Sequence, residues 1–70
     1  MKVKGWEINL FGKDATHESG MYMKFDQTTS GKWRARVLKN KHNAYELKTD
    51  EELMDEGYQL FIQAANNESV

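Results

Sequence analysis

The sequence predicts an α+β domain in which an antiparallel sheet of three to four strands packs one face against a single C-terminal amphipathic helix. Apolar residues recur at every second position through most of the chain, and with a helical period near its end. The links between the alternating segments are short, which favours antiparallel pairing. The expected element order is therefore ββββα, with the second face of the sheet uncovered by the helix.

Four segments alternate apolar and polar residues as half-buried strands do. We expect strands at residues 3–11, 21–27, 32–38 and 44–48, with a polar connection at 12–20. Alternation then directs one set of side chains toward the helix: Trp6, Ile8, Leu10, Met21, Met23, Phe25, Trp33, Ala35, Val37, Tyr45 and Leu47. The opposite face is expected to carry Lys24, Arg34, Arg36 and Lys48, together with Tyr22 and Phe11.

The helix is predicted at residues 50–65. Thr49 and Glu52 have the spacing of a capping box, in which each side chain bonds the other residue's backbone N–H. Gly57 falls on the apolar face, where it indicates either a close approach to a strand or a tolerated defect. We expect one small domain over residues 1–66 and a flexible tail at 67–70.

Length and composition exclude several classes of protein. Seventy residues support one domain without a deep pocket, and the lack of cysteine excludes disulfides, thiolate zinc sites and thiol nucleophiles. The chain has no apolar run long enough for a membrane span and no signal-peptide core, so we expect a soluble, cytoplasmic protein. Because it starts with methionine and has no linker, we also expect an independent accessory protein.

Catalytic patterns are missing from the sequence. His17, Glu18 and Ser19 are adjacent, whereas a catalytic triad draws its members from separate segments, so His17 and His42 are expected to be ordinary loop residues. No ligand spacing indicates a metal, and the scattered glycines form no phosphate-binding loop. The expectation is a protein that is not an enzyme and has no cofactor.

The net charge of −1 conceals a strongly polarised distribution. Residues 24–48 carry seven basic residues against two acidic ones, whereas residues 49–70 carry six acidic residues and no basic one. Such asymmetry indicates a charged partner, although a solvated helix face beside a solvated sheet would give the same pattern.

The basic region suggests double-stranded DNA as the partner. Arg34 and Arg36 would project from one strand face about 7 Å apart, where guanidinium groups can reach phosphates or guanine edges. The same arginines could instead serve only to keep an exposed sheet face solvated. The candidate nucleic-acid-binding residues are Lys24, Lys32, Arg34, Arg36, Lys39, Lys41 and Lys48.

Residues 21–65 also contain a recognisable succession of motifs. These are Ser30-Gly31-Lys32-Trp33-Arg34-Ala35-Arg36-Val37, Tyr45-Glu46-Leu47, Thr49-Asp50-Glu51-Glu52, and a helix with Tyr58 and Ala64-Ala65. The succession resembles the three-strand-plus-helix DNA-binding domain of plant ethylene-response factors, an architecture shared with the arm-binding domain of phage integrases. In that family the sheet lies in the major groove. The resemblance implies DNA contacts from Arg34 and Arg36, with Trp33 and Lys32 as further candidates.

The alternative is a small phage-type inhibitor or accessory protein that binds another protein. Its contact would be a free sheet edge or the acidic helix residues Glu51, Glu52, Asp55 and Glu56. A homodimer that buries Phe11 and Tyr22 between two sheets is a further alternative. One continuous patch of Lys24, Arg34, Arg36 and Lys48 would favour DNA, whereas interruption by Asp26 or Glu46 would favour a protein partner.

Overall fold

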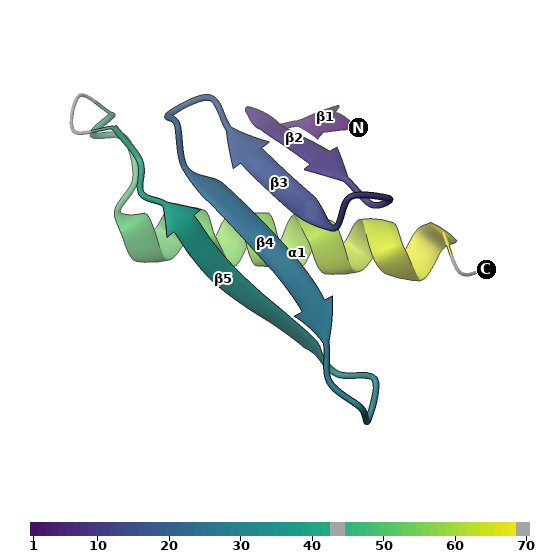
Figure 1. The fold of residues 1–70 in the computed structure, drawn as a ribbon. Helices are drawn as coiled ribbons and strands as arrows, with labels where there is room; N and C mark the ends of the chain where they lie inside the picture. The colour runs from purple at the N-terminus through teal and green to yellow at the C-terminus, as the bar shows by residue number, and fades with distance from the viewer. Residues whose placement is uncertain (43–44, 69–70) are drawn as a thin grey trace.

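The computed structural model describes residues 1–42 and 45–68, which form an antiparallel sheet followed by one helix (Figure 1). The elements are β1 Lys2–Val3, β2 Trp6–Asn9, β3 Asp14–His17, β4 Tyr22–Gln27, β5 Trp33–Lys39 and α1 Asp50–Glu68. The spatial order β1-β2-β3-β4-β5 follows the sequence, so every strand pairs with its neighbours in the chain. The predicted α+β class with a C-terminal helix is confirmed, but the sheet has five strands rather than three to four.

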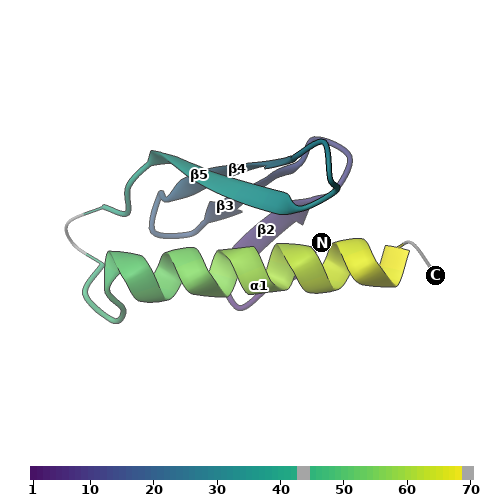
Figure 2. The ribbon, with the colours of Figure 1, turned by 90° about the horizontal axis from the view of Figure 1, so that it is seen from below.

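The helix α1 lies across one face of the sheet, and the core fills the space between these two layers (Figure 2). The rings of Phe25 on β4 and Phe61 on α1 stack with centroids 4.0 Å apart, and Trp33 meets Phe61 edge-on. The buried apolar residues are Trp6, Ile8, Ala15, Met21, Met23, Phe25, Leu53, Phe61 and Ala64. Five of the eleven inward side chains predicted from alternation are in this buried set, and Leu10, Trp33, Val37 and Tyr45 pack partly buried against it.

Gly57 allows α1 to approach the sheet closely. A Cβ atom at this position would lie 2.7 Å from Cη2 of Trp6 and 2.9 Å from Sδ of Met23. Real Cβ atoms do not come so near to their neighbours, because a carbon pair is at its optimum at about 3.5–4.0 Å. The close approach predicted for this glycine is therefore what the structure shows.

The first predicted strand is divided in two. Lys4 and Gly5 both have positive φ, +51° and +83°, and connect β1 to β2 by a two-residue turn with Val3 paired to Trp6. Turns of this kind match the twist of a hairpin, and glycine is the residue that adopts them most easily. The expected strand 3–11 is thus a short hairpin, and its continuation at residues 10–11 belongs to the next turn.

The predicted polar connection at 12–20 contains an entire strand, β3. Its inward residues are Ala15 and His17, both buried, and a small side chain and an imidazole gave no apolar alternation to detect. His17 is therefore a core residue at the end of β3 and not a loop residue. Its ring lies between Trp6 and Tyr45, with centroids 4.9 Å and 5.1 Å away.

The predicted strand at 44–48 is wrong for residues 45–48, which have no strand structure, while residue 44 lies outside the described residues. Tyr45 packs on the core, but Leu47 is 85% exposed and does not face the helix. The helix was predicted correctly in place and polarity, and it extends to Glu68. Asn67 is therefore helical rather than part of a tail, and residues 69–70 of that tail lie outside the described residues.

Candidate functional site

Strand β5 forms one edge of the sheet, and no strand in the described part of the chain pairs with its outer side. The direction of its backbone groups follows from β4. Phe25 donates its N–H to the Lys13 carbonyl at 2.8 Å, that is, away from β5. Phe25 and its partner Ala35 are therefore a non-hydrogen-bonded pair, so the N–H and C=O of Ala35 point outward from the sheet.

The turn between β4 and β5 also indicates that the backbone groups of Ala35 point outward. Thr28 donates to the Lys32 carbonyl at 2.8 Å, and hydrogen-bonded positions alternate along an antiparallel pair. Arg34 and Arg36 thus use their backbone groups within the sheet, whereas Trp33, Ala35 and Val37 direct theirs to the open edge. There the Trp33 carbonyl accepts a hydrogen bond from the Tyr58 hydroxyl at 3.4 Å. This edge has the length and polarity needed to receive another strand.

A shallow groove of about 310 Å³ runs between the open edge and the first half of α1. Ala35 lies between the larger inward side chains of β5, Trp33 and Val37, and its small size leaves the gap. The residues that line the groove are Met23, Ala35, Glu51, Met54, Asp55 and Tyr58. Ala35 was predicted to be a core residue, but it is exposed because this part of β5 lies beyond the cover that α1 provides.

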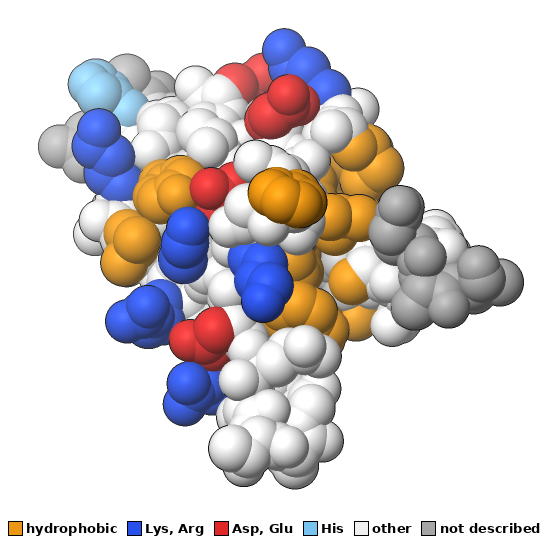
Figure 3. All heavy atoms as spheres, turned by 45° about the vertical axis from the view of Figure 1, so that its right-hand side comes forward, with side chains coloured by type: hydrophobic (Ala, Val, Ile, Leu, Met, Phe, Trp, Pro, Cys, Tyr) orange, Lys and Arg blue, Asp and Glu red, His pale blue; other side chains and the backbone are white. Residues whose placement is uncertain are grey.

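The outward face of the sheet presents rows of side chains that the strand register brings together. One row runs through Asp14, Lys24 and Arg36, and the next contains Asp26 and Arg34. Arg34 donates from Nε to Oδ1 of Asp26 at 3.0 Å, so its charge is partly balanced within the sheet. Asp26 therefore interrupts the predicted basic surface, as Figure 3 illustrates with acidic side chains among the basic ones.

Arg36 is placed differently from Arg34. It lies directly across from Lys24, and like charges in such a position destabilise a sheet. Lys24 donates to the Gly12 carbonyl at 3.3 Å and has Asp14 as its other neighbour, whereas Arg36 has no ion pair within the described residues. Arg36 at the open edge is thus a cation available to an anionic group from outside.

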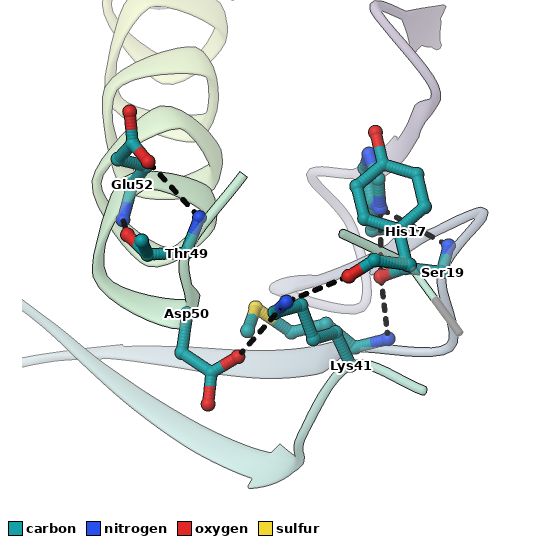
Figure 4. Close-up of polar contacts among 8 residues, drawn as sticks. His17, Ser19, Lys41, Thr49, Asp50 and Glu52 are labelled. Atoms are coloured by element: carbon teal, nitrogen blue, oxygen red, sulfur yellow. Dashed lines mark hydrogen bonds and ion pairs between the residues drawn. The ribbon is translucent and has the colours of Figure 1, made fainter. Parts of the chain in front are cut away.

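Two of the predicted nucleic-acid-binding lysines lie away from this face. Lys48 was expected there but bonds Glu56 of the helix at 2.6 Å, which corrects its placement. Lys41 donates to the Tyr45 carbonyl at 2.7 Å and lies 3.9 Å from Asp50 (Figure 4). Lys32 and Lys39 are exposed at the two ends of β5. The structure therefore leaves Lys24, Lys32, Arg34, Arg36 and Lys39 on or beside one hairpin.

The four acidic helix residues predicted to bind a protein partner also separate into two pairs. Glu52 accepts from the Thr49 N–H at 3.0 Å and its own N–H bonds the Thr49 hydroxyl, which is the predicted capping box (Figure 4). The Thr49 N–H holds the pKa of Glu52 below its usual value. Glu51 and Asp55 have no such bonds to the residues that the structure describes, and they form the rim of the groove beside β5.

Glu56 joins the helix to the sheet. It accepts from the Trp6 indole Nε1 at 3.0 Å and from Lys48, whose hydrogen bond is the main cause that lowers the pKa of Glu56. The same bond raises the pKa of Lys48. Glu52 and Glu56 therefore make hydrogen bonds within the fold, whereas Glu51 and Asp55 line the groove beside β5.

His17 and Ser19 come together as a buried pair, with Nδ1 and Oγ 2.8 Å apart (Figure 4). The Ser19 N–H donates to the same Nδ1 at 3.0 Å, so this nitrogen accepts and a neutral ring carries its proton on Nε2. Burial lowers the pKa of His17. Both residues are buried, so the contact stabilises the β3–β4 turn and exposes no nucleophile.

The described residues contain no group of three or more His, Asp or Glu side chains that could hold a metal ion. In the same part of the chain, no helix is both long and apolar enough to cross a membrane. No family model matches the chain, and no curated protein or solved structure matches it either. The resemblance to ethylene-response factor domains therefore remains a prediction from the sequence.

Proposed function

We propose that this protein is a protein-interaction module that receives an extended segment of its partner at the open edge of β5. The observation that carries the proposal is the seven-residue edge strand, in which the outward backbone groups of Ala35 border a groove with an apolar floor. Strand addition of this kind combines main-chain hydrogen bonds with pockets for alternate side chains.

The test uses a variant that blocks the edge without weakening the sheet. Ala35→Pro removes an N–H that points outward, and proline is tolerated at such positions of edge strands. Ala35→Ser is the matched control, because it keeps both the N–H and a small side chain. Circular dichroism of both variants should match the wild-type protein.

The assay is selection of random decapeptides on the wild-type protein, followed by measurement of each peptide's affinity by isotope-edited NMR. We expect the selected peptides to protect the Ala35 amide of the wild-type protein from exchange. Their affinity should fall at least about fivefold on Ala35→Pro but not on Ala35→Ser, because the lost hydrogen bond costs about 1 kcal/mol or more. Binding that Ala35→Pro leaves unchanged, or a selection that returns no binder, would refute strand addition.

DNA binding is the second candidate, favoured by the cationic β4–β5 hairpin. Lys24 and Arg36 face each other at a cost to stability, and a phosphate between them would offset the repulsion. Fluorescence anisotropy with duplex DNA at low salt tests it, with Arg36→Ala as the variant. Arg34→Ala is the control, since Arg34 is already paired with Asp26. Absence of binding at micromolar protein would exclude this candidate.

A further inference from the structure

We infer that the segment received at β5 alternates acidic and large apolar residues, with an apolar side chain opposite Ala35 and a carboxylate on each side of it. This inference rests on the proposed edge function and adds the chemistry of the partner. It follows from two features of β5 that lie on opposite faces of the strand.

The outward face sets the charge of the incoming strand. A residue paired with Ala35 has its two neighbours opposite Arg34 and Arg36, on the face where the rows Asp26–Arg34 and Lys24–Arg36 end. Arg36 has no ion pair among the described residues, and Arg34 shares one carboxylate while most of its side chain is exposed. Carboxylates on the incoming strand would extend both rows with opposite charge, and opposite charges across strands are stabilising.

The inward face sets the size of the central residue. Met23, itself a buried core residue, lies at the bottom of the gap at Ala35, and Met54 and Tyr58 bound the gap on the helix side. A space of about 310 Å³ with an apolar floor suits a side chain of the size of leucine or phenylalanine. Alternation places this side chain in the gap while its neighbours point to the arginines.

Pairing with β5 of a second copy is disfavoured in the two registers centred on Ala35 and Arg36. In an antiparallel β5–β5 pair centred on Ala35, Arg34 of each copy lies opposite Arg36 of the other. Centring the pair on Arg36 places that residue opposite itself. Both registers juxtapose like charges, which destabilise strand pairs, and charged residues on edge strands commonly prevent self-association. The arginines therefore disfavour pairing with β5 of another copy in these two registers and favour an acidic strand.

The experiment compares three nine-residue peptides that differ only at the centre: Glu-Phe-Glu, Lys-Phe-Lys and Glu-Ser-Glu. We expect Glu-Phe-Glu to bind at least about tenfold more tightly than Lys-Phe-Lys, from charge reversal at two cross-strand pairs. We expect a similar advantage over Glu-Ser-Glu, from burial of one aromatic ring. Arg36→Glu should reduce or reverse the difference in affinity between Glu-Phe-Glu and Lys-Phe-Lys. Ala35→Leu should abolish the difference between Glu-Phe-Glu and Glu-Ser-Glu, because the larger side chain fills the gap.

The outcomes separate the two proposals. Binding that is sensitive to Ala35→Pro but equal for all three peptides would overturn the acidic–apolar pattern and leave strand addition in place. Undetectable binding of Glu-Phe-Glu at millimolar concentration, alongside edge-dependent binders from the random library, would also overturn the pattern. If neither the three peptides nor the library gives binding sensitive to Ala35→Pro, both proposals fail.

Discussion

Replacement of Gly57 by alanine should destabilise the protein, although alanine is the better helix former. In an isolated helix the change would stabilise by about 1 kcal/mol. In this structure the new Cβ would lie 2.7 Å and 2.9 Å from Cη2 and Cζ2 of Trp6, and 2.9 Å from Sδ of Met23. Relief requires movement of roughly 0.5–1 Å by side chains packed in the core, because carbon contacts are optimal at about 3.5–4.0 Å.

The expected net effect follows from these two opposing contributions. Overpacking of a well-packed core costs about 1–3 kcal/mol, and contact with two buried side chains places Gly57→Ala in the upper part of that range. After subtraction of the helix propensity, we expect a loss of about 1–2 kcal/mol in the free energy of unfolding. For a domain of this size that corresponds to a fall of roughly 5–15 °C in Tm.

Urea unfolding followed by circular dichroism measures the change, and a double-mutant cycle identifies its cause. Trp6→Phe removes the distal part of the indole and leaves the contact with Sδ of Met23, so the loss on Gly57→Ala should be smaller in that background. Gln59→Ala, at an exposed position of the same helix, is the control, because it changes helix propensity without adding a contact in the core. A Gly57→Ala protein more stable than the wild type would show that the approach of α1 to β2 does not limit the packing.

Three further predictions concern α1 and the residues that immediately precede it. Glu56→Gln should reduce the fall in the free energy of unfolding at acid pH. The pKa of Glu56 is lowered in the folded protein, so its contribution to stability is present above the unfolded pKa and is lost as pH falls through the folded pKa. Urea unfolding from pH 2 to 7 measures this fall. If the free energy of unfolding of the variant fell with acid pH as in the wild type, this would contradict a stabilising role for the Lys48–Glu56 hydrogen bond. Thr49→Ala should cost about 1 kcal/mol by removing the cap, measured as a shift of the urea midpoint, with Thr29→Ala in an exposed turn as control. Leu47→Ser should change the unfolding free energy by less than about 0.5 kcal/mol, since Leu47 is 85% exposed, and a larger loss would mean that it packs after all.

The sequence was most informative where one physical signal dominated. The alternation around Met23 and Phe25 predicts β4, and the Thr49–Glu52 spacing predicts the start of α1, because burial of one face and capping are local requirements. Strand β3 escaped prediction because its buried positions hold Ala15 and His17, and His17 packs against Trp6 and Tyr45 from other segments. The sequence did contain a signal for this strand: small or ring-bearing side chains occupy alternate positions at Ala15, His17 and Ser19.

The candidate site was less predictable than the fold. Alternation assigns Ala35 to the inward face correctly, but it contains no information on how far α1 extends under β5, and that extent determines whether an inward residue is buried. Charge counting likewise grouped Lys48 with Arg36, although Lys48 bonds Glu56 on the other side of the sheet. Only the register reveals that Lys24 and Arg36 are direct neighbours.

The hydrogen bond between Trp6 and Glu56 has a consequence for the order of assembly. Each strand of the sheet meets its neighbour through a short turn, so successive hairpins can form with little loop-closure entropy. The Trp6–Glu56 contact, by contrast, joins residues 50 positions apart. Contacts of such sequence separation slow folding, so we expect α1 to dock onto the sheet later than the hairpins form.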